Sequence, residues 1–362
     1  MPRPRARDLG VPFDGTPGPL DAITDVAGVE VGHATIVLGD GALVVGAGPA
    51  RTGVTAVLPR GRDRSEPCFA GWSTLNGNGE MTGTTWLAES GFLEGPVLIT
   101  NTHSVGVVRD AVVAWRRTRG AALLQQPWSL PVVAETYDGW LNDIDGHHVK
   151  PEHAHAALDG ARSGPVDEGN VGGGTGMICH EFKGGVGTAS RLVDGFTVGA
   201  LVQANYGRRE QLRVAGVPLG AEIGGDLVYP RRDSTGDGSI IVVLATDAPL
   251  LPQQCERLSR RAGLGIARMG GIGANSSGDI FVAFSTANES AGTATSTARV
   301  TMLANDRLST LFGAAVEATE EAITNALVAA ETMIGRDGHR VVALPHDRLR
   351  DALRRHGCLA TM

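Results

Sequence analysis

The sequence predicts a layered α+β fold, and three observations predict it. Apolar runs of strand length mix with helical patterns, without the strict alternation of strand and helix that a doubly wound fold shows. The 51 glycines fall in blocks between apolar segments rather than in a low-complexity tract. Only 4% of the residues are aromatic, so the core must be built from Val, Ala, Leu and Ile, which suits sheets and helices packed closely through small side chains.

The apolar runs and helical patterns give the elements in order. Strands are predicted at 29–37, 53–58, 97–100, 132–134, 184–189, 196–203, 240–245 and 280–285. Helices are predicted at 82–90, 105–117, 153–161, 250–268, 305–334 and 347–355. No convincing linker divides the 362 residues, so we expect one large domain with a full core.

Composition narrows the class of partner. The net charge of -7 argues against nucleic acid, because phosphate binding needs clustered positive charge. The chain has no stretch of about 18 apolar residues and no signal peptide at its amino end, which predicts a cytoplasmic protein without a membrane partner. The cysteines are widely spaced and lack metal-ligand spacing.

The most informative segment is a glycine-flanked turn that holds Ser276 and Ser277 directly before the strand at 280–285. A neighbouring side-chain oxygen can approach a backbone carbonyl there with little steric hindrance, which suits a peptide bond that cleaves itself. The freed serine would carry a hydroxyl and its own amine, the nucleophile and base of N-terminal nucleophile enzymes. The alternative is a plain serine-rich turn.

Polar residues also follow two other predicted strands. Glu135 and Tyr137 come after the run at 132–134, where they could bind an ammonium group and polarise a carbonyl. Asn205 ends the run at 196–203, where its amide could donate to an oxyanion. Structural hydrogen bonds and a simple turn are the alternatives.

Two other patterns point to ligands only weakly. The glycines of 172–176 could cradle an anion, but no P-loop lysine follows them, and a tight turn or a backbone-lined pocket is favoured. His147 and His148 could suggest metal ligands, but adjacent residues on a strand point to opposite faces. The sequence therefore predicts no metal and no other cofactor.

Taken together, segments along most of the chain resemble the L-aminopeptidase/D-esterase and β-aminopeptidase family. These are autoprocessing serine hydrolases that are similar to N-terminal nucleophile enzymes but differ in strand connectivity. The segments are 23–26, 31–33, 101–106, 135–142, 169–176, 182–191, 203–207, 277–288 and 318–323. The resemblance implies a four-layer αββα sandwich, a single intertwined domain at 1–362, and a homo-oligomer of units cleaved into 1–276 and 277–362.

The resemblance also implies roles for single residues. Ser277 would attack the carbonyl of Ser276 and, once freed, the substrate. Asn205 would stabilise the oxyanion, Glu135 would hold the substrate's amino group, and Tyr137 would lie close to the nucleophile. Family members usually have Gly or Asn before the nucleophile, whereas this chain has Ser276, so a cut before Ser276 competes.

The family also places a hydroxyl and a carboxylate of the late helix close to the nucleophile. The apolar residues of 308–330 recur at helical spacing with Thr319 in mid-stripe, and Glu320 flanks the stripe. Glu321 is expected to point toward solvent. Thr319 and Glu320 are therefore the predicted pair, and the alternative for Thr319 is a core threonine that bonds back to a carbonyl.

The predicted function is a self-cleaving serine aminopeptidase or amidase, acting without a cofactor on small peptides, amides or esters. One alternative is an acyltransferase similar to the ornithine acetyltransferases, which usually present threonine as the nucleophile. The other is a non-enzymatic protein that binds an anion in the glycine loop at 172–176.

Overall fold

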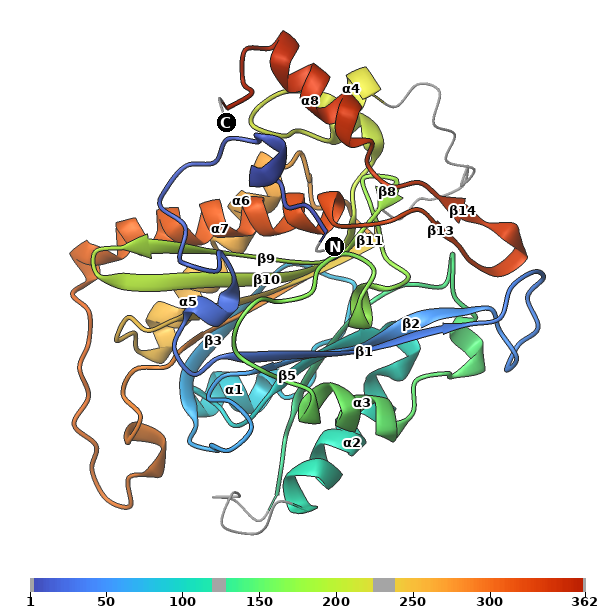
Figure 1. Cartoon of the computed structure of the whole chain (residues 1–362). Helices are drawn as coiled ribbons and strands as arrows, with labels where there is room; N and C mark the ends of the chain where they lie inside the picture. Colours follow the sequence, from blue (N-terminus) through green and yellow to red (C-terminus); the bar gives the residue numbers. More distant parts are fainter. Residues whose placement is uncertain (1–2, 119–127, 224–237, 361–362) are drawn as a thin grey trace.

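The computed structural model describes residues 3–118, 128–223 and 238–360. The chain forms four layers, with two sheets stacked face to face and helices on both outer faces (Figure 1). Three separate clusters of buried apolar side chains fill the three interfaces between these layers. The predicted α+β sandwich of type αββα is confirmed.

The smaller sheet has four strands in the order β1-β2-β5-β6. They are β1 (Glu30–Leu38), β2 (Ala50–Leu58), β5 (Val97–Asn101) and β6 (Val132–Thr136). Strands β5 and β6 run parallel, because α2 (Val105–Thr118) crosses back between them. Helices α2 and α3 (Pro151–Asp159) cover the outer face.

The larger sheet has six strands in the order β4-β3-β12-β11-β10-β9. They are β3 (Cys68–Gly77), β4 (Phe92–Leu93), β9 (Gly185–Val193), β10 (Phe196–Tyr206), β11 (Gly238–Thr246) and β12 (Gly278–Ser285). The central pair, β11 and β12, is parallel. Both strands are apolar at 240–245 and 280–284 because both of their faces are covered.

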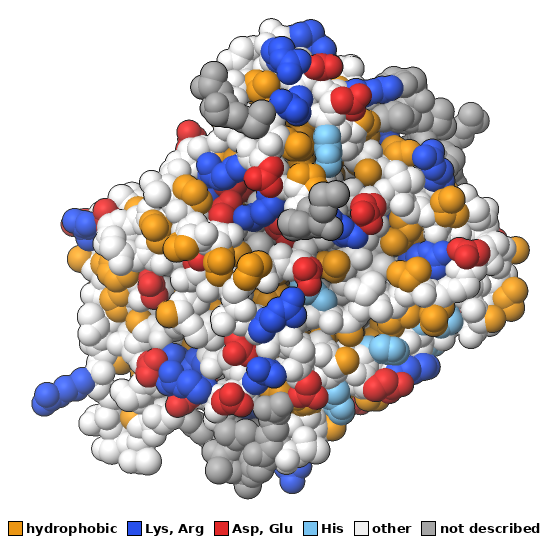
Figure 2. Space-filling model, viewed as in Figure 1, with side chains coloured by type: hydrophobic (Ala, Val, Ile, Leu, Met, Phe, Trp, Pro, Cys, Tyr) orange, Lys and Arg blue, Asp and Glu red, His pale blue; other side chains and the backbone are white. Residues whose placement is uncertain are grey.

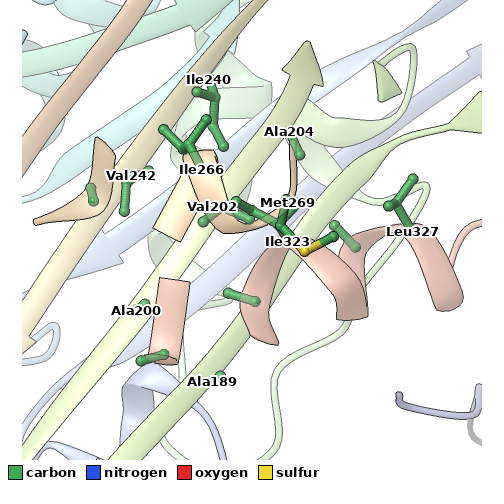
Figure 3. Close-up of a cluster of buried hydrophobic side chains, with 14 of the residues drawn as sticks. Ala189, Ala200, Val202, Ala204, Ile240, Val242, Ile266, Met269, Ile323 and Leu327 are labelled. Carbon is green, nitrogen blue, oxygen red and sulfur yellow. The ribbon is translucent and has the colours of Figure 1, made fainter. Parts of the chain in front are cut away.

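Three helices cover the outer face of this larger sheet. They are α5 (Pro252–Ser259), α6 (Ala262–Arg268) and α7 (Leu308–Val328), and α7 lies across β9 and β10. Figure 3 shows part of the apolar cluster at this interface, which includes Ala189, Ala200 and Ala204 of the strands and Ile323 and Leu327 of the helix. A core made of such small side chains lets helix and sheet approach closely.

One glycine shows how close this approach is. A Cβ atom on Gly187 of β9 would lie 2.0 Å from the carbonyl oxygen of Ala322 in α7. No residue with a side chain fits there without moving the helix. The glycine blocks of the sequence therefore serve packing here rather than flexibility.

Shorter elements complete the fold. They are α1 (Thr84–Ser90), α4 (Leu219–Ile223), α8 (His346–Arg355), β7 (Ile178–Cys179), β8 (Phe182–Lys183), β13 (Met333–Ile334) and β14 (Arg340–Val341). Among the helices of the described ranges, none is both long and apolar enough to cross a bilayer.

The short elements α4, β4, β7, β8 and β14 were not predicted, and three longer elements also differ from the sequence prediction. Strand β3 was not predicted, because Gly71, Ser73 and Thr74 interrupt its apolar run. The helix predicted at 250–268 is two helices, α5 and α6, since the chain turns at Arg260 and Arg261. The helix predicted at 305–334 ends at Val328, and its last residues form β13 instead.

Candidate active site

Asn205 lies near the end of β10 and faces the interior between the two sheets. Alternation along the strand puts it on the same face as Leu201, which belongs to the inter-sheet core. Its Oδ1 accepts a hydrogen bond of 2.8 Å from the Ile178 backbone nitrogen, and its Nδ2 donates one of 3.0 Å to the Tyr137 carbonyl oxygen. These bonds fix the amide and leave its second N–H for a ligand.

Glu135 lies at the end of β6 and is buried. Its Oε1 accepts a 3.0 Å hydrogen bond from the Glu80 backbone nitrogen, and its Oε2 accepts one from the Thr102 hydroxyl. Burial raises the pKa of this carboxyl, and the two hydrogen bonds partly offset that rise. A buried carboxylate of this kind is suited to bind an ammonium group.

A single glycine separates Glu135 from the central strands. A Cβ atom on Gly79 would lie 3.1 Å from Oε1 of Glu135 and 3.2 Å from the Cα of Gly278. Tyr137 is close too, since its carbonyl oxygen binds Asn205 while its side chain is 45% exposed. The structure thus brings Glu135, Tyr137 and Asn205 together at one end of the sandwich.

Ser277 does not share this face. Its hydroxyl donates a 2.6 Å hydrogen bond to Oδ1 of Asp279, which lies two residues further along the chain, in β12. Asp279 lies on the same face of β12 as Phe281 and Ala283, which belong to the core between this sheet and its helices. Ser277 and Asp279 also line a small hollow with Tyr206 and other residues on that side. The Ser277 hydroxyl and the Asn205 amide therefore lie on opposite faces of the sheet.

The turn before Ser277 is tightly bonded. The Ser277 backbone nitrogen donates a 2.8 Å hydrogen bond to the Ala274 carbonyl oxygen. Nδ2 of Asn78 donates one of 2.7 Å to the carbonyl oxygen of Ser276, which the predicted self-cleavage would attack. That bond would polarise the carbonyl, and it is the observation that favours a cut before Ser277.

A different serine lies directly beside Asn205. Ser239, which the sequence analysis did not single out, pairs with Asn205 across β10 and β11 and with Gly278 across β11 and β12. It shares a face with Ile241 and Val243 of the inter-sheet core. Directly paired side chains have Cβ atoms about 4.5–5.5 Å apart. Ser239 is buried, with 5% of its surface exposed.

The residue before Ser239 must be glycine. Gly238 has φ +86°, and a Cβ atom there would lie 1.7 Å from the Asn205 carbonyl oxygen. The sequence carried a signal that was overlooked, namely a Gly-Ser pair directly before the apolar run at 240–245. This pair also has the glycine that the family resemblance leads one to expect before a nucleophile.

Asp279 connects the two serines. Its carboxylate accepts hydrogen bonds from the Ser277 hydroxyl and from the backbone nitrogen of Ile240, the residue after Ser239. Burial raises the pKa of Asp279 to about 6, and the two hydrogen bonds partly oppose that rise. A hydroxyl–carboxylate pair is thereby held against the backbone of β11.

Thr319 lies elsewhere, and the structure corrects its predicted role. Its hydroxyl donates a 2.7 Å hydrogen bond to the Ala315 carbonyl oxygen within α7. Its side chain packs against α6, where a Cβ atom on Gly265 would lie 2.6 Å from the Thr319 Cβ. The alternative of a core threonine that bonds back to a carbonyl is the one observed.

The carboxylates of α7 also differ from the prediction. Glu320, predicted to face the nucleophile, forms a 2.9 Å ion pair with Arg268 on α6. Glu321, expected in solvent, is fully buried and pairs with Arg7 and Arg191 at 2.7 Å each. The amino-terminal segment covers this side of α7, which the helical periodicity could not indicate. Both orientations were wrong.

The glycine loop at 172–176 is filled by the protein itself. The backbone nitrogens of Gly172 and Gly173 donate to the hydroxyls of Thr35 and Thr55, at 2.8 and 3.1 Å. These donors are therefore not available to an anion. Within the described part of the chain, His, Cys, Asp and Glu residues form no group of three that could hold a metal ion.

Comparison with known proteins decides the family. A model described as Peptidase family S58 matches residues 21–341. The chain belongs to this family. The match to this peptidase family, together with a relative that is named an aminopeptidase, shows that the chain is an aminopeptidase, as predicted.

Two curated proteins that are similar to this chain are named beta-peptidyl aminopeptidase BapA. The one from Sphingosinicella microcystinivorans is 56% identical, covering 99% of this chain and 93% of the relative. The one from Sphingosinicella xenopeptidilytica is 48% identical, covering 96% of this chain and 90% of the relative.

Solved structures agree with the family S58 assignment. A Burkholderia sp. beta-aminopeptidase has a TM-score of 0.89 at 52% identity, covering 98% of this chain and 99% of its own. The L-aminopeptidase D-Ala-esterase/amidase from Ochrobactrum anthropi has a TM-score of 0.91 at 50% identity, covering 99% of this chain and 100% of its own. The latter is described as a prototype of the serine aminopeptidases and a new variant among the Ntn hydrolase fold. The fold of this chain is the Ntn hydrolase fold.

Proposed function

We propose that the chain is a self-cleaving serine aminopeptidase whose nucleophile is Ser239. The observation that carries this proposal is the pairing of Ser239 with Asn205 on the inter-sheet face, beside Glu135 and Tyr137. Ser277, the serine predicted from the sequence, becomes part of the supporting pair with Asp279. The predicted cut between 276 and 277 is replaced by one between Gly238 and Ser239.

Self-cleavage begins with attack of the Ser239 hydroxyl oxygen on the Gly238 carbonyl carbon. The C–N bond breaks, the hydroxyl proton passes to the nitrogen, and an ester joins the two parts of the chain. Water then hydrolyses the ester, which leaves a carboxylate on Gly238 and a free amine and hydroxyl on Ser239. Glycine at 238 leaves the attacked carbonyl without side-chain hindrance.

Turnover uses the same hydroxyl. The substrate's ammonium group binds the Glu135 carboxylate, which presents the first carbonyl to the Ser239 oxygen. The Ser239 amine accepts the hydroxyl proton and passes it to the leaving amine, while the Asn205 amide donates to the oxyanion. Water releases the acyl group in the second half-reaction.

The Ser277–Asp279 pair supports the amine of Ser239. Asp279 binds both the Ser277 hydroxyl and the Ile240 backbone, so the carboxylate and the hydroxyl are held next to the first residues of β11. A carboxylate there stabilises the protonated amine that forms during acylation. Ser277 is thus a positioning residue.

The substrates are proposed to be small peptides, amides or esters with a free amino end. The relatives named beta-peptidyl aminopeptidase make β-amino acids the first acyl groups to test. Hydrolysis of β-alanyl and L-alanyl para-nitroanilide would compare the two backbones directly. A higher kcat/KM for the β-alanyl compound is expected, and a clear preference for L-alanine would contradict it.

The working unit is proposed to be a homo-oligomer. The hairpin between β1 and β2 exposes Val37, Leu38, Val44 and Val45, and Ile334 of β13 is half exposed as well. Figure 2 shows apolar side chains gathered at that edge of the molecule. Contiguous exposed apolar side chains are typical of association surfaces. Light scattering after gel filtration is expected to give a mass above that of one chain.

Intact mass and amino-terminal sequencing of the purified protein test the nucleophile. A cut before Ser239 gives a new chain that begins Ser-Ile-Ile-Val, whereas a cut before Ser277 gives Ser-Gly-Asp-Ile. Ser239→Ala should remain uncut and inactive. Ser277→Ala is the matched control, and we expect it to be cut at the same bond but more slowly.

Three results would contradict this proposal in different ways. A new chain that begins Ser-Gly-Asp-Ile would return the nucleophile to Ser277, and one that begins Ser-Ser-Gly-Asp would move it to Ser276. An unbroken chain that hydrolyses aminoacyl anilides would remove self-cleavage altogether.

A further inference from the structure

A second hollow lies at the opposite end of the smaller sheet from Glu135. It is formed by the end of β2, the loop that follows it, the connection from β4 to β5, and the last turn of α2. The residues that line it are Leu58, Pro59, Arg60, Gly61, Arg62, Arg64, Ser65, Glu66, Leu93, Gly95, Pro96, Trp115 and Arg116. The hollow is open to solvent, and its cavity volume is about 40 Å³. None of these residues belongs to the proposed active site.

Arg60 supplies a buried donor to this hollow. The residue is 7% exposed, its Nε donates a 3.1 Å hydrogen bond to the Glu66 carbonyl oxygen, and its Nη1 donates one of 2.9 Å to that of Thr286. Nη1 also forms a 3.4 Å ion pair with Glu289, whose side chain is 57% exposed. The buried Nη2 of Arg60 has no hydrogen-bond partner among the described residues. A buried donor without a partner destabilises the folded chain, and more so when the group is charged. An acceptor that enters the hollow would remove that destabilisation.

Arg116 supplies a buried charge. It is 8% exposed, and its Nη1 donates to the Glu94 carbonyl oxygen at 2.6 Å and to the Ser129 hydroxyl at 2.9 Å. Both acceptors are neutral, so these bonds satisfy the donor without neutralising the guanidinium. Burial lowers the pKa of this group, and the charge of Glu94 opposes that lowering only in part. An anion would compensate the charge of Arg116.

The remaining lining sets the kind of anion. Arg62 is already ion-paired with Glu30, and Arg64 with Glu66 and Glu289, so the case for an anion depends on the buried Arg60 and Arg116. Leu58, Leu93, Pro96 and the ring of Trp115 form an apolar wall. Guanidinium groups bind planar carboxylates through paired N–H donors, and the apolar wall favours a ligand that is more than a bare ion.

We propose that this hollow binds a small organic carboxylate whose apolar body packs on Leu93, Pro96 and Trp115 while its carboxylate meets Arg60 and Arg116. The site is independent of the active site, because it lies at the Val97 end of β5, whereas Glu135 pairs with Thr100 near the opposite end of that strand. The ligand is either a free small acid or the carboxyl end of a peptide. Both present the same carboxylate and apolar body.

Equilibrium binding to the full chain tests the proposal, with fluorine NMR of para-fluorobenzoate as the readout. Saturable binding of one equivalent is expected, with no binding of the neutral para-fluorobenzyl alcohol. Arg116→Gln should weaken binding by about tenfold or more, because one charge-assisted bond to a ligand contributes roughly 1.5–3 kcal/mol. N-acetylphenylalanine, which resembles the carboxyl end of a peptide, serves as a competitor of para-fluorobenzoate. If the hollow prefers peptides, N-acetylphenylalanine should displace the probe more readily than a free small acid does.

A second variant keeps the test valid if loss of a buried arginine disturbs folding. Ser65→Glu places a carboxylate in the lining without removing any buried group, and it should abolish binding through charge repulsion. Ser309→Glu, an exposed position on α7, is the matched control and should bind as the unaltered chain does. Undiminished binding in Ser65→Glu, absence of saturable binding, or equal affinity for inorganic phosphate would each overturn the assignment.

Discussion

Replacement of Asp279 by Asn should change how the stability of the protein depends on pH. The pKa of the Asp279 carboxyl is raised from 3.8 to about 6 in the folded chain, mainly by burial. A carboxyl whose folded pKa is raised binds its proton more tightly when folded than when unfolded. Its ionisation therefore opposes folding, and stability falls as pH rises through the range between these two values.

The size of the effect follows from the size of the shift. A shift of about two units corresponds to about 3 kcal/mol at 1.36 kcal/mol per unit. At about pH 4 the folded Asp279 is protonated and resembles Asn, whereas at about pH 7 it is ionised and the variant is not. Because the unfolded carboxyl is already partly ionised at about pH 4, the free energy of unfolding of Asp279→Asn, relative to that of the parent, should rise by about 2 kcal/mol from about pH 4 to about pH 7.

Urea unfolding at the two pH values measures this difference. The Ser239→Ala background is suitable, because the proposal predicts that it remains a single chain, and its intact mass can be verified first. Asp110→Asn, at an exposed site on α2, is the control and should show a change of less than about 0.5 kcal/mol. A relative stability of Asp279→Asn that does not change with pH would refute the argument that burial raises this pKa.

Three further predictions concern the site and its support. Asn205→Ala should lower kcat by about 10²–10³ with little change in KM, measured with an aminoacyl anilide. In the parent enzyme, kcat/KM should fall as pH drops through the raised pKa of Glu135, and Glu135→Gln should remove that acid limb and the preference for a free amine over an acetylated one. Glu321→Gln should lower the unfolding free energy by about 3 kcal/mol, because it removes the shortest ion pair of the buried Arg191 and leaves only the longer ones to Asp21 and Glu317. The control Glu320→Gln, whose ion pair is exposed on the arginine side, should cost less than about 1 kcal/mol.

The sequence predicted the layers well because continuous apolar runs mark strands that are buried on both faces. The runs at 240–245 and 280–285 are buried on both faces, and each became a central strand of the larger sheet. Strand β3 was not predicted because Gly71 interrupts its apolar run. Glycine is needed there because α5 packs against it, and a Cβ atom on Gly71 would lie 2.3 Å from the Glu256 backbone nitrogen. A residue type selected by contact with a distant helix breaks the local pattern on which strand prediction depends.

The candidate site was predicted in part. Glu135, Tyr137 and Asn205 follow strands whose ends meet, so position along the chain was enough to place them together. The choice between Ser239 and Ser277 depends on strand register and on which face each side chain takes, and a shift of one residue reverses that face. The predicted orientation of Glu321 was wrong for a related reason. Helical periodicity does not reveal that the segment containing Arg7 covers the outer side of α7.

The position of β11 has a consequence for how the enzyme can be made. This strand is hydrogen-bonded to β10 on one side and to β12 on the other, while the backbone nitrogen of Ala6 bonds to the side chain of Asn325 on α7. After a cut before Ser239, strands of both fragments would therefore remain side by side in the same sheet. Neither fragment alone would contain a complete hydrophobic core. The two halves should not reconstitute activity when synthesised apart and mixed, and the protein must be translated as one precursor to reach its working form.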